Sequence, residues 1–177
     1  IPKTGVFGLY DLIGIDLMAD VLKSFIKELP ETDDFQIVAK EIPLVKKLIE
    51  TGYTGRKGKG GFYRMNKSDN KKILEGISLE TGEYSLSKKF NLGSEKMDIV
   101  GLINRKDKYG EYAWSVISKI IKYASSLVPG ITDKFNDIDE AMRLGFNWSK
   151  GPFEMLKEIG VKDFFERIDT FENNKFL

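Results

Sequence analysis

The sequence predicts a mainly α-helical protein that carries one small β-hairpin. Apolar residues recur at the 3.6-residue spacing of an amphipathic helix in most segments, and Gly or Pro separates those segments. Only residues 73–86 alternate in type as a hairpin does. With 177 residues, of which 41% are hydrophobic, the chain has enough apolar content for a globular protein of one or two domains.

The first third of the chain contains three predicted helices. Residues 5–14 form a short one that ends in glycine. A longer amphipathic helix starts from Asp16 as its N-cap and stops at Pro30, because proline lacks the N–H that a helix interior needs. Pro43 begins the third helix at a position where proline is favoured, and Gly52 provides its left-handed end.

The middle of the chain is predicted to be irregular apart from the hairpin. Residues 52–61 hold five glycines, too many for a regular element, and therefore predict a loop. Alternating residues on both sides of a turn at 80–83 predict the hairpin. Residues 87–108 have mixed polar character and predict a linker with one helical turn, which is where we expect the domain boundary.

Four helices are predicted after the linker. The strongest runs over about residues 113–128 and has about five turns. The next is expected to have Asp137 as its N-cap and Glu140 at position N3, a capping-box variant. Residues 151–160 predict a short helix with proline near its start and glycine at its end, and residues 164–168 lie in a last one.

The composition limits the chemistry of the chain. It contains no His and no Cys, which excludes a His-based triad, a thiolate nucleophile and the usual zinc and haem sites. We therefore assign no catalytic residue and no metal ligand. Charge is balanced overall, but residues 56–72 hold seven Lys and Arg residues against one Asp. Such a patch suits phosphate groups, although a solvated loop is the simpler interpretation.

Two further patterns concern the location of the protein. No charged segment precedes an apolar stretch at the start of the sequence, as it would in a secretory signal. The most apolar stretch, residues 114–128, is interrupted by Lys119 and Lys122 and is too short to span a bilayer. We therefore expect a cytoplasmic protein with no membrane partner.

An internal repeat is present at an offset of 146 residues. It aligns two short segments that share a Gly–x–Phe start and an Ile–Gly end. The aligned pairs include Gly5 with Gly151, Phe7 with Phe153 and Gly14 with Gly160. The segment before the second copy has no counterpart before the first, and the segment after the first copy has no counterpart after the second. We interpret the chain as parts of two copies of one unit.

Two motifs resemble a known family. Residues 137–156, DIDEAMRLGFNWSKGPFEML, resemble the C-terminal domain signature of 3-hydroxyacyl-CoA dehydrogenases, in which an acidic-capped helix ends in Gly before a Gly-Pro-Phe-Glu turn. Residues 54–63, TGRKGKGGFY, with residues 5–16 before them, resemble the end of the same domain. The resemblance covers residues 1–65 and 109–165, and it is specific because both motifs occur in the internal order of the unit.

The resemblance implies a fold and a domain layout. The fold is a helical C-terminal domain of the 6-phosphogluconate-dehydrogenase-like type, in tandem copies as in the long multifunctional fatty-acid oxidation enzymes. Residues 1–65 would be the second half of the first copy, and residues 109–177 the first half of the second. Residues 66–108 would be the hairpin and linker between them.

The resemblance also implies a function in fatty-acid β-oxidation, the NAD-dependent oxidation of a 3-hydroxyacyl-CoA. In that family an N-terminal domain binds NAD and supplies a His–Glu pair as general base. We therefore expect this chain to bind no cofactor and to be inactive alone. It would serve oligomerisation and form part of the acyl-CoA cleft. Its expected partners are the NAD-binding domain, further copies of the enzyme and acyl-CoA, with no nucleic acid.

The same resemblance suggests two groups of site residues. The family turn that faces the acyl cleft corresponds to Gly5, Val6 and Phe7, although turn packing explains these residues equally well. The candidates for contact with a CoA phosphate are Arg56, Lys57 and Lys59. For these three, an interface or a solvated loop remains an alternative.

One departure from the family, one further hypothesis and two alternatives complete the sequence evidence. Trp114 stands where the family has a substrate-contacting Asn, which suggests that the second copy is a scaffold.

Residues 109–160 and 1–65 would together build one domain in permuted order if the helix near 112–128 packs on the helix near 17–29. A nucleic-acid-binding module would use the basic segment 56–72 with three stacking rings, Tyr53, Phe62 and Tyr63. A pure dimerisation domain is the remaining alternative.

Overall fold

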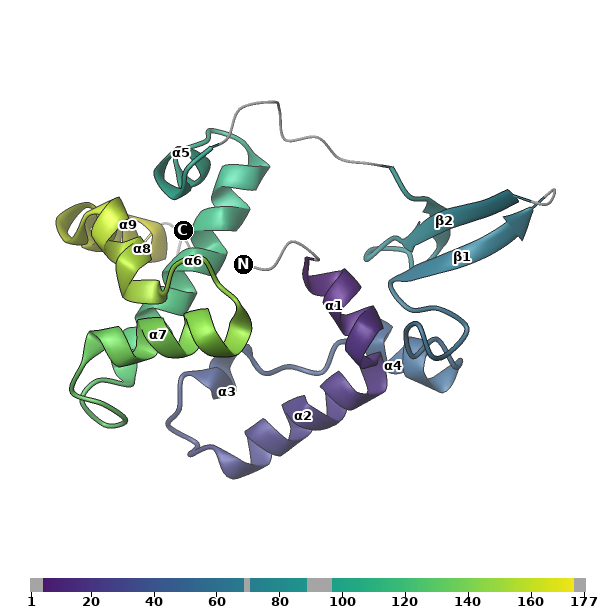
Figure 1. Ribbon diagram of the computed structural model, residues 1–177, viewed down its shortest axis with the longest axis horizontal. Coiled ribbons are helices and arrows are strands. Elements are labelled where there is room, and N and C mark those ends of the chain that lie inside the picture. Colours follow the sequence, from purple (N-terminus) through teal and green to yellow (C-terminus); the bar gives the residue numbers. More distant parts are fainter. Residues whose placement is uncertain (1–4, 69–70, 89–96, 174–177) are drawn as a thin grey trace. The chain divides into compact units, whose positions relative to one another are not determined.

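The computed structural model describes residues 5–68, 71–88 and 97–173. They form two compact units, an N-terminal unit at Lys3–Leu92 and a C-terminal unit at Gly93–Leu177 (Figure 1). Helices make up most of the described residues, and strands occur only in one small sheet. The predicted mainly α class with a small hairpin is therefore confirmed.

The N-terminal unit begins with helices. They are α1 (Val6–Ile13), α2 (Ile15–Glu28), α3 (Phe35–Val38) and α4 (Pro43–Glu50). Helices α1, α2 and α4 are the three that periodicity predicts, with ends shifted by one or two residues. Helix α3 was not predicted, because four residues are too few to show a period; Asp33 Oδ1 accepts the N–H of Phe35 at its start, at 2.8 Å.

Three antiparallel strands come next, in the order β1-β2-β3: β1 (Tyr63–Ser68), β2 (Lys71–Ile77) and β3 (Tyr84–Leu86). Strands β2 and β3 are the predicted hairpin, paired with Ile77 opposite Tyr84. Strand β1 was missed because it comes directly after a glycine-rich loop. Its first residue, Tyr63, lies opposite Gly76, and the Tyr63 ring would be in van der Waals contact with a Cβ there, at 3.5 Å.

The core of the N-terminal unit joins the helices to the sheet. Three side chains from α2, α4 and the residue before β1 are buried: Ile15, Leu48 and Phe62. Partly buried side chains surround them, including Tyr10, Tyr53 and Ile77. The end of the glycine-rich loop therefore packs against α2 and α4 and is not a free segment.

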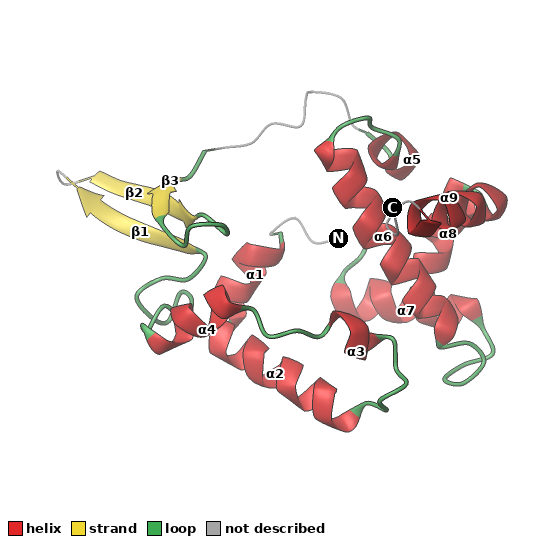
Figure 2. Ribbon diagram, turned by 180° about the vertical axis from the view of Figure 1, so that it is seen from behind, coloured by secondary structure: helices red, strands yellow, loops and turns green. Residues whose placement is uncertain are grey.

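The described residues of the C-terminal unit form helices and the loops between them (Figure 2). Its helices are α5 (Ile99–Ile103), α6 (Lys108–Ser126), α7 (Phe135–Phe146), α8 (Pro152–Ile159) and α9 (Val161–Asn173). Helix α5 is the predicted helical turn. Helix α6 begins five residues before the predicted start, because Asp107 caps it by accepting the N–H groups of Tyr109 and Gly110.

The expected capping box of α7 is wrong. The helix begins at Phe135, two residues before Asp137, and no side chain caps its first turn. Asp137 instead accepts the hydroxyl of Thr132 at 2.9 Å, so it stabilises the preceding turn. Glu140 is therefore not at position N3.

The core of the C-terminal unit is built on one face of α6. Ala113, Trp114, Ile117 and Ile121 are buried at helical spacing along it. The facing side chains are Ile103 of α5, Met155 of α8 and Phe164 of α9. This face of α6 is thus already covered within its own unit.

The internal repeat has the same local structure in both units. Helices α1 and α8 each have eight residues and end at a glycine of positive φ, 118° at Gly14 and 92° at Gly160. Each glycine N–H donates to the carbonyl four residues earlier, and a second helix, α2 or α9, starts at the next residue. We call this arrangement the helix–Gly–helix module.

Candidate functional site

The glycine-rich loop 52–61 is fastened to α1 by one buried aspartate. Asp11 is 4% exposed, and its two carboxylate oxygens accept the N–H groups of Phe62 and Tyr63, each at 2.8 Å. Its backbone carbonyl accepts the N–H of Arg56 at 2.8 Å. A carboxylate that accepts two buried N–H groups compensates for its own desolvation. Asp11 therefore holds the middle of the loop and the residues at its end against the same helix.

Two of the loop glycines are required by this close approach. A Cβ at Gly61 would lie 2.0 Å from Asp11 Oδ1, and a Cβ at Gly55 would lie 2.5 Å from the Asp11 carbonyl oxygen. Gly55 also has a φ of 111°, which side chains rarely adopt. The glycine content of this segment thus has a structural cause.

The backbone of this loop is not a phosphate cradle. Its N–H groups are largely used within the unit: Gly55 donates to Gly60, Gly58 to Gly55, Lys59 to Gly52 and Gly61 to Tyr63. A phosphate-binding loop instead presents free N–H groups to the anion. Contact with a phosphate at this loop must therefore come from side chains.

The three basic candidates of the loop differ in their surroundings. Arg56 and Lys57 are exposed and have no ion-pair partner among the described residues. Lys59 donates to the carbonyl of Thr51 at 3.1 Å, and its Nζ lies 6.0 Å from the ring centre of Tyr53. The structure thus leaves Arg56 and Lys57 as neighbouring free cations and ties Lys59 to the loop.

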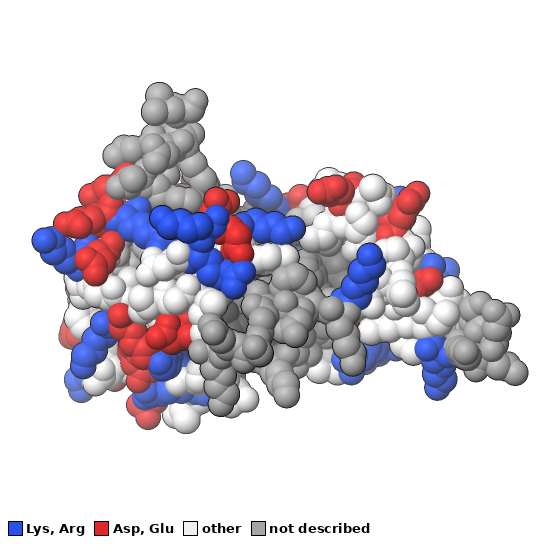
Figure 3. Space-filling model, turned by 90° about the horizontal axis from the view of Figure 1, so that it is seen from above, with Lys and Arg blue, Asp and Glu red and all other residues white. Residues whose placement is uncertain are grey.

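The structure describes only part of the wider basic segment 56–72, because residues 69 and 70 lie outside the described residues. On the face drawn in Figure 3, basic and acidic side chains are interleaved. Arg64 is neutralised by Glu75, with Nε to Oε2 at 2.6 Å. The hydrogen bond from Arg64 also lowers the pKa of the Glu75 carboxyl.

The prediction that Phe62 is one of three stacking rings for nucleic acid is wrong. Its ring is 6% exposed and packs against the rings of Phe7 and Tyr10, with centroids 4.7 Å and 6.0 Å away. A core ring has no free face on which a base can stack. Tyr53 is half-buried against Tyr84, so only Tyr63, 39% exposed, is accessible as predicted.

The cleft candidates Gly5, Val6 and Phe7 lie at the start of α1. Gly5 has a φ of 73°, a Cβ there would meet no atom of the described residues within 4 Å, and Val6 is 55% exposed. Phe7 is 39% exposed, and its ring contacts that of Phe62. The three residues form an apolar, accessible helix start.

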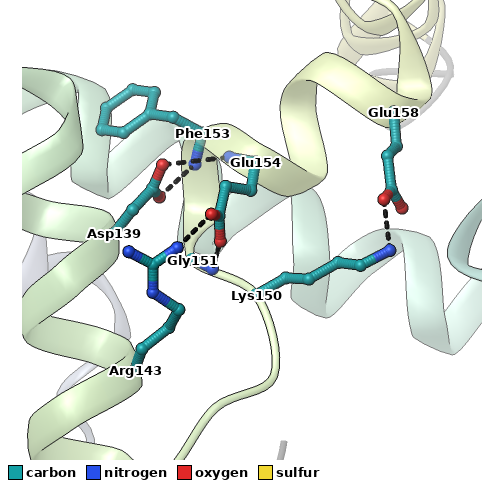
Figure 4. Close-up of polar contacts among 7 residues, drawn as sticks. All are labelled: Asp139, Arg143, Lys150, Gly151, Phe153, Glu154 and Glu158. Carbon is teal, nitrogen blue, oxygen red and sulfur yellow. Dashed lines mark hydrogen bonds and ion pairs between the residues drawn. The ribbon is translucent and has the colours of Figure 1, made fainter.

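The C-terminal unit contains a second buried aspartate whose carboxylate accepts two successive backbone N–H groups, as Asp11 does (Figure 4). We call this arrangement an aspartate clamp. Asp139 of α7 is 3% exposed and accepts the N–H groups of Phe153 and Glu154, at 2.8 Å and 3.2 Å, at the start of α8. Glu154 in turn accepts the N–H of Gly151 at 2.8 Å and pairs with Arg143 of α7. Burial is the main cause that raises the pKa of the Asp139 carboxyl.

Trp114 lies in the core of the C-terminal unit and not at an open surface. It is 1% exposed, with the Phe164 ring 5.4 Å away and the Arg167 guanidinium 4.1 Å from its ring centre. Arg167 is held there because it donates to the carbonyl of Ile103 at 2.7 Å. A small polar side chain that contacts substrate would need access that this position lacks.

Sequence reasoning did not identify Asp11 and Asp139 as buried side chains that accept backbone N–H groups. Both sit among apolar residues of an amphipathic helix, on the buried side where a charge needs partners. An aspartate on the apolar side of a helix therefore predicts a buried carboxylate that needs hydrogen-bond donors. The partners themselves are not readable from local patterns, because Asp11 bonds to residues more than 50 positions away.

No cluster of three or more acidic side chains in the described part of the chain is placed to hold a metal ion. Across the same residues, no helix is both long enough and apolar enough to cross a membrane.

Comparison with known proteins agrees with this arrangement. Residues 2–65, which include α1, the clamp at Asp11 and the glycine-rich loop, match the family described as 3-hydroxyacyl-CoA dehydrogenase, C-terminal domain. These residues are similar to that domain. The resemblance stated from the sequence is confirmed.

Relatives extend the similarity over most of the chain. The "Putative fatty acid oxidation complex trifunctional enzyme" of Rickettsia felis is 41% identical over 92% of this chain, and that of Rickettsia prowazekii is 39% identical over the same share. The "Probable 3-hydroxyacyl-CoA dehydrogenase" of Bacillus subtilis is 30% identical over 95% of the chain. The chain spans 22% of the length of each of these relatives. No solved structure matched significantly.

Proposed function

We propose that this chain is a non-catalytic helical portion of an NAD-dependent 3-hydroxyacyl-CoA dehydrogenase of fatty-acid β-oxidation. The observation that carries the proposal is the family match of residues 2–65, the segment that Asp11 closes into one packed unit. The sequence has no His, so the general base of the reaction comes from another part of the enzyme. That part is the NAD-binding domain, and it makes the chain dependent on a partner.

The surface suits two roles in the assembled enzyme. Gly5, Val6 and Phe7 offer an accessible apolar wall for an acyl chain, and the cations of Arg56 and Lys57 suit a CoA phosphate. Along α2, three apolar side chains four residues apart are exposed: Leu17, Val21 and Phe25. Such a stripe favours helix packing between subunits, and we assign the oligomerisation role to it.

The activity is tested in a chimera. The matched region of the Bacillus subtilis relative is replaced by this chain, and NADH formation from a 3-hydroxyacyl-CoA is followed. We expect the chimera to be active and the purified chain to be inactive under the same conditions. Turnover by the chain alone would contradict the proposal, and so would an inactive chimera that is folded and binds NAD.

The phosphate contact is tested by substitution in the same chimera. Arg56→Ala with Lys57→Ala is expected to raise KM for the acyl-CoA roughly tenfold with kcat unchanged, because uniform substrate binding is lost. Lys40→Ala with Lys46→Ala removes the same charge from exposed positions of the same unit and is the matched control. An unchanged KM in the first variant would remove the phosphate role and leave the dehydrogenase assignment standing.

A further inference from the structure

One tyrosine ring of the N-terminal unit stands apart from the other aromatic side chains. The rings of Phe62 and Tyr53 are each covered by a second ring. Tyr63 is 39% exposed, and among the described residues no other ring lies against it. Successive side chains of a strand point to opposite faces, so Tyr63 is on the face of β1 away from Arg64 and its partners.

The sheet supports this ring from below. Tyr63 lies opposite Gly76 in the register of β1 and β2, and a Cβ at Gly76 would be 3.5 Å from Cε1 of the ring. The ring therefore lies over a position that has no side chain. Met65 and Leu74, the next pair on the same face, are also exposed. The ring is thus backed by the sheet and has apolar neighbours beside it.

Asp11 brings this ring and the two free cations of the glycine-rich loop to one place. The N–H of Tyr63 donates to Asp11 Oδ2, and the N–H of Arg56 donates to the Asp11 carbonyl oxygen, each at 2.8 Å. Lys57 follows Arg56 and is also exposed. The charged ends of these two side chains are carried on long flexible stems. One accessible ring and two cations therefore start from backbone held by the same buried residue.

This combination suits one nucleotide better than a strand. Proteins that bind single strands stack successive bases on successive rings. Of the three rings considered for that role, Phe62 is in the core and Tyr53 is half-buried, which leaves Tyr63. One base on one ring, with its phosphates on neighbouring cations, is what a single nucleotide requires. Coenzyme A ends in such a group, an adenosine that bears a ribose phosphate and a pyrophosphate.

We propose that Tyr63 stacks on the adenine of coenzyme A while Arg56 and Lys57 bind its phosphates. The face of the sheet that carries Tyr63 then forms an adenosine subsite, in addition to the phosphate contact of the loop. The inference rests on the proposed function for the identity of its ligand. NAD also contains an adenosine and a pyrophosphate but has no ribose phosphate, so the two sources can be separated by experiment.

Truncated substrates in the chimera test the subsite. The matched region of the Bacillus subtilis relative is replaced by this chain, and KM is measured for a 3-hydroxyacyl-CoA, for the same acyl group on pantetheine and for NAD. Tyr63→Leu keeps an apolar side chain over Gly76 but removes the ring. It is expected to raise KM for the acyl-CoA about tenfold with kcat unchanged. KM for the acyl-pantetheine, which lacks the adenosine, and for NAD should stay the same.

Tyr63→Phe is the conservative variant in this series. It is expected to keep the wild-type KM for the acyl-CoA, because stacking needs the ring and not the hydroxyl. A rise in KM for NAD in place of the acyl-CoA would overturn the assignment to coenzyme A. Unchanged KM values for all three compounds in an active Tyr63→Leu chimera would remove the subsite and leave the dehydrogenase assignment standing.

Binding to the isolated chain gives a readout that needs no turnover. Coenzyme A is titrated into the chain, and NMR follows its adenine protons, which a stacked aromatic ring shifts upfield. The dissociation constant is expected to rise about tenfold in Tyr63→Leu. Dephospho-coenzyme A, without the ribose phosphate, is expected to bind more weakly than coenzyme A to the wild type.

Tyr112→Leu is the matched control for this titration, because it removes an exposed ring from α6 in the other unit. It should leave both the shift and the dissociation constant unchanged. An inactive chimera combined with the upfield shift would contradict the dehydrogenase and support the subsite. Absence of the shift in the wild type, or an equal shift in Tyr63→Leu, would overturn the subsite whatever the activity of the chimera.

Discussion

Tyr84 connects three parts of the N-terminal unit through one side chain. Its hydroxyl donates to the carbonyl of Gly61 at 2.5 Å, at the end of the glycine-rich loop. Its ring lies 5.5 Å from that of Tyr53 and 3.9 Å from the guanidinium carbon of Arg64. Burial is the main cause that raises the pKa of Tyr84 to about 12.

This raised pKa predicts a loss of stability in alkaline solution. A free tyrosine titrates near pH 10, so between about pH 10 and about pH 12 the unfolded chain releases a proton that the folded unit keeps. The free energy of unfolding therefore falls as pH rises through this range. Urea unfolding followed by circular dichroism at several pH values is expected to show a smaller fall in Tyr84→Phe than in the wild type.

Tyr112→Phe is the matched control, because Tyr112 is 69% exposed on α6. Its variant should keep the wild-type slope. Identical slopes in the wild type and Tyr84→Phe would show that Tyr84 does not carry the effect.

At the scale of elements, each module glycine forms a one-residue junction between two successive helices. Gly160 has a φ of 92°, and a Cβ there would lie 3.1 Å from Asp163 Oδ2. Gly145 is different: it is inside α7, has no unusual φ, and a Cβ there would meet nothing within 4 Å. The same substitution should thus have opposite effects at the two positions.

We expect Gly160→Ala to lower the free energy of unfolding of the C-terminal unit by about 1–2 kcal/mol, because a left-handed conformation strains a residue with a Cβ. Gly145→Ala is expected to raise it by about 0.5 kcal/mol through better helix propensity. Urea unfolding followed by tryptophan fluorescence measures both. A stabilised Gly160→Ala variant would refute the argument from its backbone conformation.

The helices were predictable because their signal is local. Helix α2 shows its period in consecutive residues, and the ends of α4 and α8 are marked by proline and glycine. The start of α7 was misplaced because Asp137, a good N-cap by type, bonds to Thr132 instead. Strand β1 was missed because its pairing with β2 and the ring of Tyr63 over Gly76 arise only in the folded sheet.

The candidate site was predictable only in part, for the same reason. Arg56 and Lys57 were identified by charge, and the structure leaves them exposed. Phe62 was proposed as a stacking ring on the basis of residue type, but long-range packing buries it. Asp11 and Asp139 act on backbone groups of other elements, and nothing in their immediate neighbours indicates which groups those are.

On the scale of the whole molecule, the two units can be observed separately. Both tryptophans, Trp114 and Trp148, belong to the C-terminal unit. Their fluorescence therefore reports on that unit, whereas circular dichroism reports on the helices of both. The clamp residue Asp11 belongs to the other unit.

Asp11→Ala is expected to destabilise the N-terminal unit by about 2–4 kcal/mol, since two buried N–H groups lose a charged acceptor. In urea, part of the circular dichroism transition should move to lower concentration while the tryptophan transition stays in place. Asp20→Ala removes an exposed charge from α2 and should change either transition by less than about 0.5 kcal/mol. A matching shift of the tryptophan transition in Asp11→Ala would show that the two units unfold together.

The two aspartate clamps differ in how much chain they close. Asp139 reaches across 14 residues to Phe153, whereas Asp11 reaches across 51 residues to Phe62. Loop-closure entropy grows with the logarithm of the enclosed length, so the longer ring costs about 1 kcal/mol more to form. We therefore expect the α7–α8 corner to form at a lower entropic cost than the contact of the glycine-rich loop with α1.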